Sequence, residues 1–247
     1  MKTDTKRNPW LKTRNKHLIL GIAIITLLAG IWLTVYPQIE RQRTLYDQAR
    51  LMESITDGDG TMILDPVVAW AEPDFYAGPD EEDTLYPGQW VSSGLDDSHP
   101  PVESVELADA ESDIITGIGI LSIDKIDLRL PVVDGVSKRQ LKVAVGRVPQ
   151  TAEIGAIGNA VIAGHRSYAY GQYFNRLGEL ENGDIIEYQP REGETMRFEV
   201  YNIRIIRPGD QSAFQQPGDF SEITLYTCTP IRVASHRLLI QAKLITD

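Results

Sequence analysis

The chain has 247 residues, of which 42% are hydrophobic, and a formal net charge of -11 at pH 7. This length gives room for one sizeable domain with additional segments. Binding to nucleic acid phosphates requires a basic face, so the acidic balance argues against nucleic acid as a partner. The single cysteine, Cys228, excludes an intramolecular disulfide, and the core alone must therefore hold the fold together.

The N-terminal part has the pattern of a membrane anchor. Residues 1–17 carry six basic side chains and one acid, and residues 18–36 then run for 19 positions without a charge. A helix of that length nearly spans a hydrocarbon core of about 30 Å. The alternative is a cleaved signal peptide, but the run is long for one and no clear small-residue cleavage site follows it. We expect a single-pass anchor with residues 1–17 in the cytoplasm and the bulk of the chain outside the cell.

Two further segments precede the β-rich part. Residues 37–56 are polar with one weak apolar face, which predicts a short membrane-proximal helix. Residues 57–113 contain 16 Asp or Glu, neither Lys nor Arg, and many Gly and Pro pairs. High charge of one sign and frequent turn signals predict an acidic spacer, extended or loosely packed.

From residue 114 onwards short apolar or alternating runs predominate. Strands are predicted over residues 117–123, 128–133, 159–165, 184–189, 195–207, 222–228 and 236–245, with a helix capped by Ser137 and a helical turn at residues 174–180. Seven or eight strands with brief helices predict an all-β fold, a closed or nearly closed barrel over residues 114–247.

Three side chains of the β-rich part could carry chemistry. Cys228 ends an apolar strand, where a thiol is held by the scaffold and still reachable, although a free Cys is often only a small buried hydrophobe. His165 also ends a strand, and a Cys–His pair at one rim of the barrel would activate the thiol. Arg237 begins the strand after Cys228, so a guanidinium could bind a developing oxyanion there. Spacing alone leaves structural roles open for His165 and Arg237.

These residues lie in two motifs that resemble those of the sortase family. The segment TLYTCTP at residues 224–230, followed by HRLL at 236–239, resembles the family's TLxTC signature with its downstream Arg. The segment GNAVIAGHRS at residues 158–167 resembles the one that carries the catalytic His. The resemblance covers about residues 115–245, and the order His, Cys, Arg also fits.

The resemblance implies an eight-stranded β-barrel on the outer face of a Gram-positive membrane, working without a cofactor. Cys228 would attack the Thr carbonyl of an LPxTG-like sorting signal and form a thioester. His165 would act as acid and base, and Arg237 would hold substrate and oxyanion. Thr227 matches a position that often lines the substrate groove. The accepting amine would come from a peptidoglycan precursor or from a pilin Lys.

Two subfamilies fit the motifs. Class C members polymerise pilins and often carry a lid with an Asp-Pro-aromatic plug. Asp65 and Pro66 are a candidate for this lid, but Val67 follows where an aromatic residue would be expected. No second apolar span follows the last strand, whereas many class C enzymes have one. We therefore expect a class D-like role in anchoring surface proteins to the cell wall, with class C as the alternative.

Other kinds of protein remain as alternatives. Papain-like and L,D-transpeptidase enzymes usually place Cys before His, and this chain has the reverse order across 63 residues. A surface β-barrel binding module with a buried Cys228 would need no chemistry. No His/Cys cluster has metal-ligand spacing, and we predict no metal site.

Overall fold

The computed structural model describes residues 9–64, 114–166, 172–231 and 233–245. These fall into two compact units, residues 1–46 and residues 47–247, with helix α1 (Pro9–Asp57) running from one into the other. The predicted membrane helix and membrane-proximal helix thus form one continuous helix of 49 residues, with Pro37 inside it.

The first unit contains a helix that is long and apolar enough to cross a membrane. Its large apolar side chains from Ile19 to Val35 are exposed. The hydroxyls of Thr26 and Thr34 donate to carbonyls one turn earlier in the same helix, at 2.9–3.2 Å. Polar groups satisfied within the helix suit a hydrocarbon environment, so this segment is a candidate membrane anchor.

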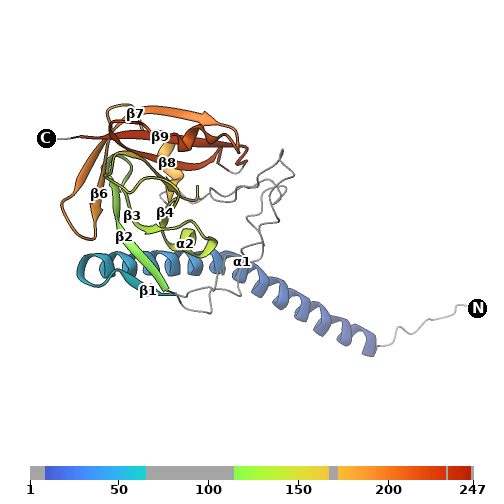
Figure 1. Cartoon of the computed structure of the whole chain (residues 1–247). Coiled ribbons are helices and arrows are strands. Elements are labelled where there is room, and N and C mark those ends of the chain that lie inside the picture. The colour runs from blue at the N-terminus through green and yellow to red at the C-terminus, as the bar shows by residue number, and fades with distance from the viewer. Residues whose placement is uncertain (1–8, 65–113, 167–171, 232, 246–247) are drawn as a thin grey trace, which may run out of the picture. The chain divides into compact units, whose positions relative to one another are not determined.

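The second unit is a closed β-barrel (Figure 1). Eight strands follow one another around it in the order β2-β3-β4-β5-β8-β9-β7-β6, and β6 pairs back with β2 to close the ring. The strands are β2 (Ile114–Ile123), β3 (Leu128–Asp134), β4 (Val145–Arg147), β5 (Gly158–Ala163), β6 (Ile185–Pro190), β7 (Met196–Ile206), β8 (Ser221–Thr229) and β9 (His236–Leu244). The prediction of an all-β, eight-stranded barrel is confirmed. The pairs β3–β4 and β5–β8 are parallel, and the other neighbours are antiparallel.

Short helices connect the strands. They are α2 (Lys138–Val143) and the 3-10 helices η2 (Asp124–Ile126), η3 (Phe174–Glu179) and η4 (Gln211–Phe214). Ser137 caps α2 as predicted, because its hydroxyl accepts from the Gln140 amide while the Gln140 side chain accepts from the Ser137 amide.

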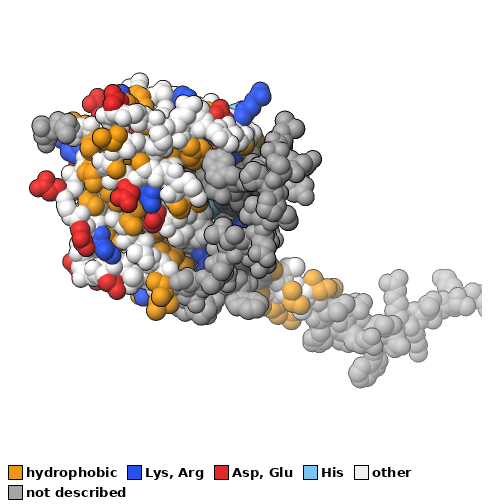
Figure 2. All heavy atoms as spheres, viewed as in Figure 1, with side chains coloured by type: hydrophobic (Ala, Val, Ile, Leu, Met, Phe, Trp, Pro, Cys, Tyr) orange, Lys and Arg blue, Asp and Glu red, His pale blue; other side chains and the backbone are white. Residues whose placement is uncertain are grey.

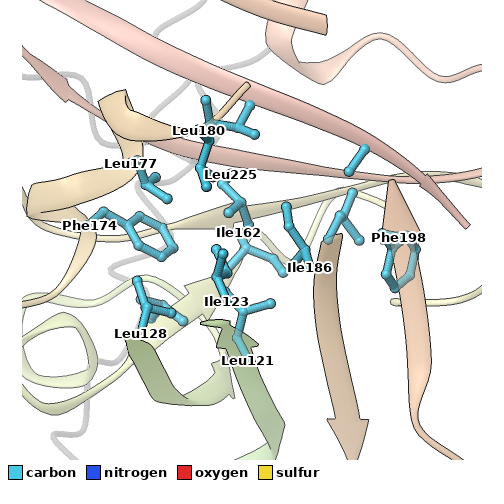
Figure 3. Packing of buried hydrophobic residues seen from close by; sticks show 14 of the residues in the cluster. Leu121, Ile123, Leu128, Ile162, Phe174, Leu177, Leu180, Ile186, Phe198 and Leu225 are labelled. Carbon is cyan, nitrogen blue, oxygen red and sulfur yellow. The ribbon is translucent and has the colours of Figure 1, made fainter. Parts of the chain in front are cut away.

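Large apolar side chains fill the interior of the barrel (Figure 3). Alternate residues of β8 and β9, such as Leu225 and Ile240, point inward, and Phe174 and Leu177 of η3 join them. A small barrel of this kind is a packed core and not a channel. Outside it, acidic and basic side chains lie interspersed on the face shown in Figure 2. Ion pairs on the barrel surface include Lys125–Asp184 at 2.8 Å.

The last turns of α1 belong to the barrel unit. Leu51 and Ile55 are buried against Ile115 and Ile120 of β2. Gly117 permits this approach, since a Cβ there would lie 2.4 Å from the Ile55 Cδ1 atom. Strand β1 (Thr61–Ile63), which falls within the segment predicted as spacer, pairs with the start of β2.

Tyr188 of β6 makes the barrel sensitive to alkaline pH. Its hydroxyl donates to the Ile118 carbonyl at 2.9 Å, and burial raises the pKa of Tyr188 to about 12. The neutral phenol is favoured in the folded state, so this stabilisation is complete below pH 10 and is lost as the pH rises to 12. A shift of two pKa units corresponds to about 3 kcal/mol.

We therefore expect the free energy of unfolding to fall between pH 10 and 12 by about 3 kcal/mol more for the wild type than for Tyr188→Phe. Urea unfolding of the chain in detergent micelles, at each pH, measures this. Parallel pH dependences for the two proteins would contradict it.

Candidate active site

Cys228 and Arg237 lie opposite each other on neighbouring strands. They are Cα partners in the antiparallel pair β8–β9, and the loop between the two strands spans residues 230–235. Directly opposed residues of an antiparallel pair present their side chains on the same face. Cys228 is half-buried, and Arg237 is only 6% exposed.

His165 follows β5, which is the neighbour of β8 on the side opposite β9. Strand β5 runs parallel to β8, and their last paired residues are Ala163 and Tyr226. The contact continues beyond β5, because the Gly164 amide donates to the Tyr226 carbonyl at 3.1 Å and the Thr227 hydroxyl donates to the Gly164 carbonyl at 2.7 Å. One residue further along each segment, His165 stands level with Cys228.

Cys228 and Arg237 lie on the outer face of the barrel. Along β8, inward Leu225 alternates with Tyr226, which packs outside with Ala163 and Leu239 under Phe214 of η4. Cys228 follows Tyr226 by two residues on β8, and Arg237 precedes Leu239 by two on β9, so alternation puts both side chains on this outer face. His165 is exposed. The topology therefore brings the backbone positions of His165, Cys228 and Arg237 to the same level on three adjacent segments.

The guanidinium of Arg237 is held by neutral acceptors. Its Nη1 donates to the carbonyls of Ala234 and His236 at 2.9 and 3.1 Å. Burial raises the pKa of Tyr226, and the Arg237 charge opposes that shift. Among the residues that the structure describes, the acceptors that orient this side chain are backbone carbonyls and not carboxylates.

Arg166 is part of the site, although the sequence analysis overlooked it. Its Nη1 and Nε donate to the carbonyls of Cys228 and Asn175, each at 3.4 Å. Burial lowers the pKa of Arg166, and a negative charge on Cys228 opposes that shift. The guanidinium links the segment of His165 to β8 and η3. The only signal in the sequence was a basic residue next to His165 at a strand end.

The other residues predicted for the site are Thr227, Asp65 and Pro66. Thr227 is 2% exposed, and its hydroxyl ties β8 to Gly164. A contact of Thr227 with substrate stays a prediction. Asp65 and Pro66 lie outside the described residues. Within the described ranges, His, Cys, Asp and Glu form no group of three that could hold a metal ion.

Comparison with known proteins identifies the family of the β-rich part. The Sortase domain family model matches residues 121–245, half of the chain. Sortase D of Bacillus subtilis is 32% identical over 131 residues, which are 52% of this chain and 64% of that protein, just under two thirds of its length.

Two solved structures are similar over the barrel. Sortase C1 from Streptococcus agalactiae has a TM-score of 0.51 and 30% identity, and the match covers 53% of this chain and 68% of that one. Sortase C from Streptococcus pneumoniae has a TM-score of 0.50 and 28% identity, with 53% and 70% covered. By the family match, the motifs and the closed barrel, this chain belongs to the sortase family.

Proposed function

We propose that this chain is a membrane-anchored cysteine transpeptidase that cleaves an LPxTG-like sorting signal and joins the new acyl end to an amine. The observation that carries the proposal is the alignment of His165, Cys228 and Arg237 across three adjacent segments of the barrel. A nucleophile, a base and a fixed cation at one site are what acyl transfer through a thioester requires.

The chemistry proceeds in two halves. The Cys228 thiolate attacks the Thr carbonyl carbon, and the Thr–Gly C–N bond breaks as His165 protonates the leaving nitrogen. A thioester joins Cys228 to the substrate. An incoming amine then attacks this thioester, loses its proton to His165, and releases the thiolate. Arg237 stabilises the negative oxygen of both tetrahedral intermediates.

We infer that the accepting amine comes from a peptidoglycan precursor, as in a class D-like enzyme that anchors surface proteins to the cell wall. The similarity to sortase D of Bacillus subtilis favours this reading. The second candidate is a class C-like pilin polymerase that uses a Lys of a pilin. It is supported by the likeness to the Streptococcus pneumoniae sortase C, whose structure was described in relation to pilin substrate specificity.

The membrane helix would place the barrel on the outer surface, with residues 1–17 in the cytoplasm. The basic cluster in residues 1–17 supports this orientation. Proteolysis of right-side-out vesicles tests it. The barrel should be degraded from outside while an N-terminal tag survives.

The test of activity uses the full chain in detergent micelles with a panel of LPxTG-like peptides. Mass spectrometry should detect a thioester adduct on Cys228 that disappears when an amine is added. A short peptidoglycan stem peptide and a pilin-like Lys peptide, supplied separately, distinguish the two acceptors. The absence of any adduct across the panel, with a folded protein, would contradict the proposal.

A further inference from the structure

Tyr173 lies beside the candidate site in a backbone conformation that side chains rarely adopt. It precedes η3 with φ 46° and ψ -139°, in a region where glycine is favoured. A residue other than glycine persists there only if its surroundings fix it, and such positions concentrate at functional sites. The contacts of Tyr173 should therefore show why a tyrosine, and not a glycine, occupies this position.

Contacts of both the side chain and the backbone hold Tyr173. Its hydroxyl donates to the carbonyl of Lys142 in the last turn of α2. Its backbone forms an isolated antiparallel bridge with Arg166, and the next amide, that of Phe174, donates to the His165 carbonyl at 3.0 Å. Phe174 is fully buried in the barrel core. The chain around Tyr173 is thus bound directly to the backbone of the candidate base.

The ring of Tyr173 contacts the imidazole of His165. The ring centroids are 6.1 Å apart and the planes are 84° from parallel, an edge-to-face pair within the favoured range for aromatic rings. His165 is exposed, so a neighbouring ring limits the orientations that its imidazole can adopt. A general base must keep a fixed orientation toward its nucleophile.

We propose that Tyr173 is a positioning residue that fixes the orientation of the His165 imidazole, with its hydroxyl anchored on α2 and its backbone conformation selected for that contact. The proposal rests on the proposed function for its effect on catalysis. The effect on the imidazole itself does not depend on that function.

The experiment compares Tyr173→Leu, Tyr173→Phe and Tyr188→Phe in the full chain in detergent micelles. Leu removes the ring, whereas Phe keeps the ring and loses the hydroxyl. Tyr188→Phe is the matched control, because Tyr188 also donates its hydroxyl to a backbone carbonyl, that of Ile118, but lies on β6, which pairs with β2 and β7 and not with β5. The measurements are kcat and KM for peptide ligation, the pH profile of Cys228 alkylation, and the His165 ring resonances by NMR. The variant His165→Gln assigns those resonances.

Tyr173→Leu should lower kcat about tenfold with KM changed less than twofold, and should shift the His165 resonances and the alkylation profile. Phe should recover most of the loss, and Tyr188→Phe should match the wild type in every readout. Wild-type His165 resonances and alkylation profile in Tyr173→Leu would overturn the proposal. So would a Phe variant no better than Leu. If the wild type ligates no peptide, the resonances and the alkylation profile still decide the matter, so that failure of the proposed function stays distinguishable.

Discussion

Cys228→Ala is expected to abolish cleavage and ligation of a sorting peptide, with a rate lower by a factor on the order of 10⁴ or more. Cys228 is the single cysteine of the chain, so no other thiol can form the thioester. His165 and Arg237 would remain, but without the thiol they could only weakly assist direct attack of water on the peptide bond. The measurement is peptide turnover by chromatography, together with the adduct mass.

The control must show that the loss is chemical. Replacing the half-buried sulfur should change the free energy of unfolding by about 1 kcal/mol or less. Ser122→Ala removes one atom of similar size from a half-buried position of β2, remote from β8, and should leave turnover unchanged. Turnover by a folded Cys228→Ala protein at the wild-type rate would rule out a thioester on Cys228 as the route of cleavage.

Much of the barrel could be predicted because its strands are long and apolar. The expected strand at residues 222–228 is β8 (Ser221–Thr229), and the expected strand at 236–245 is β9 (His236–Leu244). Strands β1 (Thr61–Ile63) and β4 (Val145–Arg147) were missed. Three residues are too few to show a period, and both strands are defined by their partners, β2 for the first and β3 and β5 for the second.

The site could be predicted only in part. Motif order indicated His165, Cys228 and Arg237, but the parallel pairing of β5 and β8 that brings them level is a property of the closed barrel. Arg166 and Tyr173 could not be predicted in the same way. Arg166 acts through the carbonyls of Cys228 and Asn175, and Tyr173 contacts α2 and His165 through tertiary structure. Such contacts leave no local pattern in a single sequence.

Arg237→Ala is expected to lower kcat/KM by about 10²–10³, the effect of removing one oxyanion-stabilising group. Arg237→Lys should recover little of it. A lysine keeps the positive charge, but it lacks the further N–H donors that a guanidinium can present to substrate while its Nη1 donates to the Ala234 and His236 carbonyls. Tyr226→Phe, which removes a hydroxyl that interacts with the Arg237 charge, should cost a few-fold in kcat/KM because the guanidinium loses part of its orientation.

Loss of stability must be separated from loss of catalysis, because Arg237 is 6% exposed and bonded to two backbone carbonyls. Arg147→Ala is the matched control. The Arg147 side chain is 11% exposed, donates to the carbonyls of Thr151 and Ala152 and pairs with Asp134 at 2.7 Å. Its strand, β4, is separated from β8 by β5. Both variants should lose about 1–3 kcal/mol of unfolding free energy, but only Arg237→Ala should lose ligation in assays well below its unfolding temperature. Equal ligation rates for Arg237→Ala and Arg147→Ala would show that Arg237 has no catalytic role. The same conclusion would follow if Arg237→Lys were fully active and Arg237→Ala lost only stability.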